Sequence, residues 1–126
     1  HLHYQLKSNL LQQDAQTGES TLTDPRAWLF ENGEPSWKLS ADSGWLSQDR
    51  AWARLQDNVV ITELPASTLK ATTQQVKLDL KSGQANNDEA VTITEAGNKL
   101  QGHGLFADFR ADLLRLEADV RGTYAP

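Results

Sequence analysis

The chain carries a weak internal repeat of about 30 residues, which limits the folds open to it. Each unit places a leucine two positions before a small residue, and these leucines are Leu6, Leu39, Leu69 and Leu100, 33, 30 and 31 residues apart. Each unit then closes with an acidic or amide side chain ahead of a short apolar segment, as in Asn58-Val-Val-Ile61. Because a fixed period indicates one supersecondary unit used several times, we expect the four units to share one shape.

The third unit indicates what that shape is. Residues 76–80 alternate between apolar and polar side chains, residues 81–84 form a Lys-Ser-Gly-Gln turn cluster, and residues 91–93 alternate again. This pattern predicts a strand, a turn and a second strand. Residues 46–59 and 106–120 also have apolar spacings that are compatible with an amphipathic helix. Since the third unit cannot be helical, we predict hairpins in those two segments as well.

Turn-forming residues separate the units. Clusters rich in Gly, Pro, Asn, Asp and Ser occur at residues 14–18, 31–35, 64–67 and 95–98. About eight short strands joined by such turns are typical of antiparallel all-β folds. We therefore predict an antiparallel β-jelly roll or open twisted sandwich, built from about four strand–turn–strand repeats, in which residues 1–126 form a single domain.

One strand of the third unit changes its phase. Leu69 and Ala71 occupy odd positions, whereas Val76, Leu78 and Leu80 occupy even positions. Because alternate residues of a strand face opposite sides of a sheet, both sets reach one interior only through a bulge or a bend. We expect such an irregularity between residues 71 and 76.

The charge balance argues against several partners. The 126 residues include 12 Lys or Arg and 17 Asp or Glu, which gives a formal net charge of −5. The basic residues are scattered singly or in pairs, so we expect no nucleic-acid partner and no binding to an anionic surface. Cysteine is absent, which excludes disulfides, thiolate metal sites and cysteine nucleophiles.

Candidate catalytic residues are equally few. The glycines form no phosphate-binding loop, no nucleophile-elbow pattern is present, and the aspartates fall beside turns that they can cap. His1 and His3 read as a surface pair at the end of the chain, and His103 lies between Gly102 and Gly104 in a pattern typical of a bulge. We expect no enzyme activity, no cofactor and no metal site. A carbohydrate-binding sandwich, or a small glycosidase with paired carboxylates, is the alternative from another class.

The aromatic residues favour a large apolar interior. Trp28, Trp37, Trp45 and Trp52 all lie in the first half of the chain, and we expect most of them in the core of the sandwich. If the two sheets do not close fully, their interior can hold a lipid chain, and their edge strands are free to pair with other proteins.

Longer motifs resemble a known family. Residues 37–49, which read Trp-Lys-Leu-Ser-Ala-Asp-x-x-x-Leu-Ser-x-Asp, and residues 55–61, Leu-x-x-Asn-Val-x-Ile, resemble the repeated motif of lipopolysaccharide transport proteins. Residues 100–108, Leu-x-Gly-x-Gly-Leu-x-Ala-Asp, followed by Leu114-x-Leu-x-x-x-Val-x-Gly-x-Tyr-x-Pro126, are similar to the LptC family. The resemblance runs through essentially the whole chain.

This resemblance implies a fold and a function. Members of the LptC family carry one N-terminal transmembrane helix and a periplasmic β-jelly roll. They receive lipopolysaccharide from the ABC extractor complex of the inner membrane and pass it to the bridge protein LptA by edge-to-edge strand pairing, for assembly of the outer membrane. Since the chain does not begin with Met, we expect the anchor of an inner-membrane protein to precede it. The soluble LptA-like bridge protein is the alternative within this class.

The resemblance also implies roles for particular residues. Leu114 and Tyr124 match the edge that pairs with the bridge protein, the N-terminal edge would meet the extractor, and Gly104 matches a functionally sensitive glycine. Asp57 replaces the glycine that the family usually has before Asn-Val, and Leu22 replaces an aromatic residue. The side chains expected to line an apolar groove for the acyl chains are Leu22, Leu39, Leu46, Leu55, Val59, Ile61, Val76, Leu78, Leu80, Ile93, Phe106 and Leu116.

Overall fold

A computed structural model describes residues 2–124, so that His1 and Pro126 lie outside the described residues. Within the described range every regular element is a β-strand, which confirms the all-β prediction. The strands are β1 (Leu2–Lys7), β2 (Leu10–Gln13), β3 (Ser20–Thr23), β4 (Arg26–Glu31), β5 (Glu34–Ser40), β6 (Ser43–Leu46), β7 (Trp52–Glu63), β8 (Leu69–Asp79), β9 (Gln84–Glu95), β10 (Asn98–Asp108) and β11 (Leu113–Thr123).

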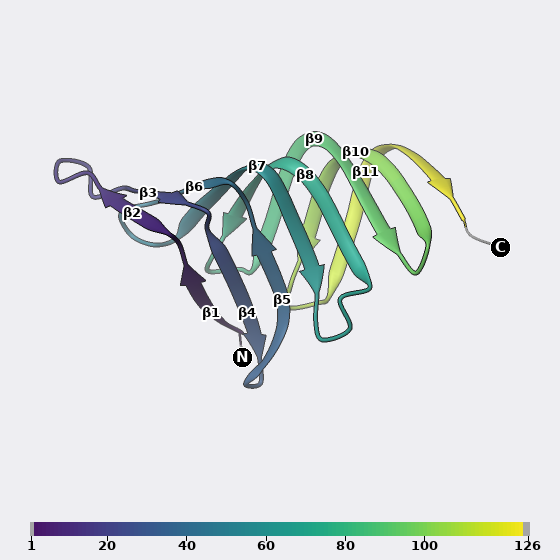
Figure 1. Ribbon diagram of the computed structural model, residues 1–126, viewed down its shortest axis with the longest axis horizontal. Coiled ribbons are helices and arrows are strands. Elements are labelled where there is room, and N and C mark those ends of the chain that lie inside the picture. The colour runs from purple at the N-terminus through teal and green to yellow at the C-terminus, as the bar shows by residue number, and fades with distance from the viewer. Residues whose placement is uncertain (1, 125–126) are drawn as a thin grey trace.

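All strands join one antiparallel sheet that is folded into two layers (Figure 1). The main path runs β1-β4-β5-β7-β8-β9-β10-β11, and β2, β3 and β6 attach to β7 from the side. The first half of β7 pairs with β6, and its second half pairs with β5. We call the layer that contains β1, β4 and β5 the first layer and the layer that contains β2, β3 and β6 the second layer. The long strands β7 to β11 contribute to both.

The two layers meet along a line of bulges. The register of β7 with β8 shifts between Gln56 and Val59, and further shifts occur between β8 and β9, β9 and β10, and β10 and β11. Residues with a left-handed backbone lie on this line, namely Asp57, Asn58, Gly104 and Asp119. The shift in β8 falls between Thr72 and Lys77, as the change of phase in the sequence predicts.

The repeat has a physical meaning in this sheet. Leu6, Leu39 and Leu100 lie in a single row across the first layer, with partners that all face the interior. Leu69 lies on the same face but two residues from Ala71, in the next inward-facing row. The segments 46–59 and 106–120 are both hairpins with a turn in the middle, which confirms that their helical spacing is misleading.

Both layers contribute to a single core. The first layer supplies Leu29, Trp37 and Ile61, and the second supplies Leu55 and Phe109, all of them at most 3% exposed. Two contacts between side chains join the layers directly. The rings of Trp37 and Phe109 lie 5.3 Å apart between centroids, and Trp37 Nε1 donates a hydrogen bond to Asp112 Oδ1 at 2.9 Å.

The expectation that most tryptophans are in the core is wrong, because only Trp37 is buried. Trp28 lies on the outer face of the first layer, because the residues on either side of it, Ala27 and Leu29, face the interior. Trp45 and Trp52 lie on the outer face of the second layer. Each outer ring is covered by a cation. For example, Lys77 Nζ lies 4.4 Å from the Trp52 ring centroid. Cation–π contacts and long side-chain stems therefore stabilise these rings instead of burial.

Candidate functional site

The interior between the layers contains nearly all the side chains that the sequence suggests for a groove. Leu80 and Leu116 are partly buried and pack against the core. The buried ones, each at most 7% exposed, are Leu22, Leu39, Leu46, Leu55, Val59, Ile61, Val76, Leu78 and Ile93. Their arrangement follows from the strand alternation and from the bulges, which bring residues of both layers to one inner face.

Phe106 is the exception, and its expected place in the groove is wrong. Its neighbours Leu105 and Ala107 are buried in the core, so Phe106 points to the outer face of the second layer. There the Arg115 guanidinium lies 4.6 Å from the ring centroid. The cause is the bulge at Gly104, which changes the phase of β10 between Gly102 and Leu105.

The interior opens at the β1 end into a cavity of about 340 Å³. Its wall is almost entirely apolar and comes from both layers, with Tyr4 and Leu6 on one side and Leu22, Leu78 and Leu80 on the other. A cavity of this size and composition is typical of a site for an apolar small molecule or chain.

A few polar groups lie at this cavity. Arg50 and Lys81 contribute two cations to its lining. The Tyr4 hydroxyl is buried and has no hydrogen-bond partner among the described residues, and burial raises the pKa of this phenol above its usual value. The cavity therefore combines an apolar wall with groups able to contact an anionic headgroup.

A second cavity, of about 350 Å³, lies at the β11 end. Leu69, Ile93, Leu100 and Leu114 form its apolar part, and Tyr124 lies beside them. Its polar lining comes from Glu95, Asn98 and Asp112. The hydrogen bond from Trp37 to Asp112 lies at this cavity, so the turn of residues 109–112 forms part of the boundary between the cavity and the core.

Both ends of the sheet have unpaired edges. Strand β1 pairs only with β4, β2 only with β3, and β11 only with β10 (Figure 1). Among the described residues, the large hydrophobic side chains that are exposed lie almost all on these edges, Trp52 being the exception. They are Leu6, Leu10 and Leu11 at one end and Leu113, Val120 and Tyr124 at the other. Exposed apolar edges of this kind are ready to accept another strand.

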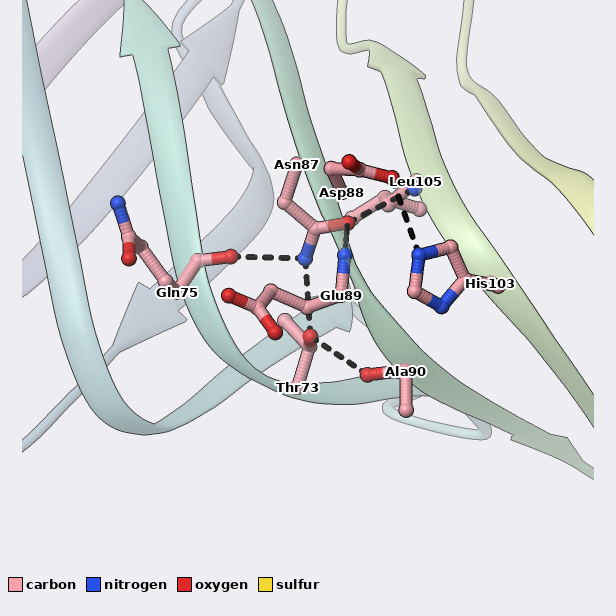
Figure 2. Close-up of polar contacts among 8 residues, drawn as sticks. All are labelled: Thr73, Gln75, Asn87, Asp88, Glu89, Ala90, His103 and Leu105. Carbon is pink, nitrogen blue, oxygen red and sulfur yellow. Dashed lines mark hydrogen bonds and ion pairs between the residues drawn. The ribbon is translucent and has the colours of Figure 1, made fainter.

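A polar network holds the bend of the sheet between these ends (Figure 2). The Asn87 side chain donates hydrogen bonds to Thr73 Oγ1 at 2.9 Å and to the Gln75 carbonyl at 2.7 Å. Its oxygen accepts from the amides of Leu105 and Glu89, at 2.9 and 3.3 Å. One side chain thus ties together the irregular segments of β8, β9 and β10.

No group of three or more His, Asp or Glu side chains within residues 2–124 is arranged to hold a metal ion. A search of the same residues for a helix long and apolar enough to cross a membrane finds none. His103 Nε2 donates a hydrogen bond to the exposed Asp88 carboxylate, 3.0 Å away, and this pair lies on the surface near the bend.

Residues 1–125 match the family described as lipopolysaccharide-assembly, LptC-related. The chain belongs to the LptC-related family. Its fold resembles the crystal structure of LptH, the LptA-homologous periplasmic component of the lipopolysaccharide transport device of Pseudomonas aeruginosa. The two superpose with a TM-score of 0.71 at 11% identity, over 98% of this chain and 96% of LptH. No curated protein matches the sequence.

Membership in the LptC-related family assigns the chain a role in lipopolysaccharide transport. This is a family of transport-bridge components that are not known as enzymes. The resemblance seen in the sequence is therefore confirmed at the level of the family, and the β-jelly-roll prediction is confirmed by the likeness to LptH.

The structure shows where the two departures of this LptC-related chain from the expected motif lie, at a bulge and in a cavity wall. Asp57 has a φ of 67° and Asn58 a φ of 55°, so the bulge keeps the left-handed backbone that glycine would provide. Asp and Asn are the residues that tolerate this conformation best after glycine. Leu22 lies in the wall of the cavity at the β1 end, where an aromatic side chain would occupy more of the space.

Reasoning from the sequence missed several residues of the site. Tyr4, Arg50 and Lys81 line the cavity at the β1 end, and Asp112 lines the one at the β11 end. Arg50 and Asp112 lie in turns with left-handed backbones, at φ of 60° and 53°. Only the tertiary fold brings such exposed turn residues beside the cavities, although the alternation of Tyr4 with Leu6 in the sequence could have placed Tyr4 on the inner face.

Proposed function

We propose that this domain holds lipopolysaccharide by its acyl chains in the interior between the two layers. It would receive the lipid from the inner-membrane ABC extractor complex and pass it to an LptA-like bridge protein in the periplasm. The observation that carries the proposal is the position of the two apolar cavities, each beside one unpaired edge of the sheet. Residues 1–126 would act as one periplasmic unit, attached to the inner membrane in the complete protein.

The interior supports acyl-chain binding on energetic grounds. Each CH₂ group moved from water into an apolar site contributes about 0.8 kcal/mol, so a lipid with several chains binds without a positive protein field. Both cavities are lined by leucines that come from strands of the two layers. Arg50 and Lys81 lie where they can pair with phosphate at the β1 end.

The edges support transfer between neighbouring proteins. Edge-to-edge pairing would place the β11 end of one domain against the N-terminal edge of the next, so that the apolar interiors become continuous. In this arrangement the edge of β1 and β2 meets the extractor complex, and the edge of β11, with Leu114 and Tyr124, meets the bridge protein. Gly104 adopts the left-handed backbone of the bulge in β10, the strand that pairs with β11.

Site-specific photocrosslinking tests the lipid site. We would introduce a photoreactive amino acid at Leu80 for one cavity, at Leu114 for the other, and at Lys77 on the outer face as the matched control. With lipopolysaccharide present, we expect labelling at Leu80 and Leu114 and little at Lys77. Labelling that is equal at all three positions, or absent from the two inner ones, would contradict the proposal.

The soluble LptA-like bridge protein fits the same fold, and the likeness to LptH supports it equally. The two assignments differ in the neighbour that each edge binds. Pull-downs with the purified extractor complex and with LptA separate them, because the LptC role requires the extractor at the β1–β2 edge. A domain that pairs only with further bridge proteins would favour the LptA-like role.

The carbohydrate-binding alternative requires exposed tryptophans aligned on one face. Trp28 lies on the outer face of the first layer, and Trp45 and Trp52 lie on that of the second. Basic side chains cover their rings. This arrangement disfavours a stacking platform for sugars, so the transport function is the one that we propose.

A further inference from the structure

The outer face of the first layer collects basic residues that are scattered in the sequence. Two neighbouring rows of the register cross all eight strands of this layer, one from Gln5 to Thr123 and the other from Lys7 to Arg121. We call their sixteen positions the basic face. Its cations are Lys7, Arg26, Lys38, Lys70, Lys99 and Arg121.

The basic face contains no Asp or Glu at any of its sixteen positions. The other six Lys and Arg residues share the rest of the chain with all 17 Asp and Glu. None of the sixteen side chains is buried. Half of the cations of a protein of net charge −5 are therefore gathered on one face whose own positions hold no carboxylate, an arrangement that favours contact with anionic groups.

The residues between the cations indicate what kind of partner fits. The other positions hold mainly Thr, Ser and Gln, and the centre of the face has only Val60 as an apolar side chain. Protein–protein interfaces typically have an apolar or aromatic centre and contain few lysines. The basic face has a polar centre and is rich in lysine. An acidic protein partner is therefore disfavoured.

The shape and the border of the face favour a membrane. Eight strands at the usual spacing span about 34 Å, which exceeds what one small anion can use. Trp28 lies at the β1 end with Lys7 Nζ and Lys38 Nζ 5.5 and 5.4 Å from its ring centroid. Tryptophan beside basic side chains is typical of proteins that rest on the headgroup region of a bilayer.

We propose that the basic face docks the domain onto a bilayer surface that exposes anionic phospholipid headgroups. The lysine ammonium groups would contact the phosphates, the threonine hydroxyls would donate hydrogen bonds to them, and Trp28 would lie at the interface. The cavities and the edges of the sheet would remain accessible, because the basic face is on the opposite side of the first layer from the interior.

Vesicle co-sedimentation tests this without lipopolysaccharide, so its result is independent of the proposed transport function. The probe is a vesicle of phosphatidylcholine with or without phosphatidylglycerol. We expect binding only when phosphatidylglycerol is present, and we expect it to weaken as NaCl is added. The double variant Lys70→Gln with Lys99→Gln should lower the partition coefficient about fivefold per residue removed, or about 25-fold.

The matched control removes two cations from the other layer, as Arg54→Gln with Lys77→Gln, and should bind nearly as well as the parent protein. A second double variant, Lys7→Gln with Arg121→Gln, tests the ends of the face in case the first one is unstable. Equal loss in all variants, no preference for phosphatidylglycerol, or binding to polyglutamate in place of vesicles would overturn the proposal.

Discussion

The amide nitrogen of Asn87 donates a hydrogen bond to the hydroxyl of Thr73 at 2.9 Å, and Thr73 in turn donates to the Ala90 carbonyl at 2.8 Å (Figure 2). Thr73 is only 4% exposed, so these polar groups are removed from water and depend on one another. The bend that turns one sheet into two layers is thus held by side chains where the backbone ladder is interrupted.

We predict that Asn87→Ala destabilises the fold by about 2 to 3 kcal/mol, because it leaves buried or half-buried partners on β8 and β10 without these hydrogen bonds. Asn87→Asp should also destabilise, since a carboxylate cannot donate to Thr73 and the Gln75 carbonyl. Urea denaturation measures both. The neighbouring exposed residue provides the control, and Asn86→Ala should change stability by less than about 0.5 kcal/mol. Equal effects at the two positions would contradict a bracing role for Asn87.

Trp37→Phe tests the contact between the layers. The change keeps a buried aromatic ring against Phe109 but removes the Nε1 donor to Asp112. We expect a loss of about 1.5 to 3 kcal/mol, the usual range for a hydrogen bond to a charged group. In a double-mutant cycle with Asp112→Asn, additive effects would show that the two side chains are not coupled.

Gly104→Ala should destabilise the protein more than Gly33→Ala does. Both glycines have a left-handed backbone, with φ of 82° and 83°. A Cβ at position 104 would lie 3.2 Å from Glu117 Cβ, whereas none of the surrounding atoms is within 4 Å of one at position 33. We expect about 1 kcal/mol or more of strain at both and an additional penalty at Gly104. Thermal unfolding of the two variants measures the difference, and identical midpoints would argue against the crowding at the bulge.

Val120→Lys tests the edge of β11. Val120 is 53% exposed on an edge strand, and a lysine there opposes pairing with another strand while leaving the fold intact. We expect loss of association with the LptA-like partner in pull-downs and an unchanged unfolding midpoint. Gln101→Lys, on the neighbouring strand β10, is the control and should still bind. Persistent binding by Val120→Lys would place the docking edge elsewhere.

The hydrogen bonds of Asp79 lead us to expect part of the loss of folding stability at low pH. Its carboxylate accepts hydrogen bonds from the amides of Ser82 and Lys81, which hold its pKa below the usual 3.8. A carboxyl whose pKa is lower in the folded protein stabilises the fold above pH 3.8, and this contribution is lost as the pH falls through the lowered value. Asp79→Asn should therefore make the loss of stability below pH 3.8 shallower, as measured by urea denaturation at several pH values. An unchanged pH profile would contradict this.

The sequence was sufficient for the parts of the fold that depend on alternation and on turn residues. The pattern of residues 76–80 predicts the strand, and the change of phase after Ala71 predicts the bend. It is harder to predict which side chains of a strand face the interior, because a single bulge reverses the direction of every following side chain. The Gly102-x-Gly104 pattern indicates a bulge, but it does not show which residue is the extra one, and the inward orientation expected for Phe106 is therefore wrong.

The site was less predictable than the fold. Inward leucines follow from periodicity, but the linings of the cavities depend on which turns lie beside them. Arg50 and Asp112 reach the cavities from turns that are distant in the sequence from much of the remaining lining. The basic face could not be predicted from the sequence for the same reason. Lys38, Lys70 and Lys99 come to lie in one row, on every second strand, only through the register of the sheet.

The two unpaired ends of the sheet differ from each other, and this has a consequence for assembly. If the β11 edge of one copy pairs with the β1–β2 edge of the next, the contact is heterologous, because it joins two different surfaces. Such pairing forms a ring where the rotation between successive copies closes and an open filament where it does not, and a filament grows until a different protein caps it. In an open filament formed by the proposed edge pairing, the number of copies would therefore be set by the proteins that cap its two ends.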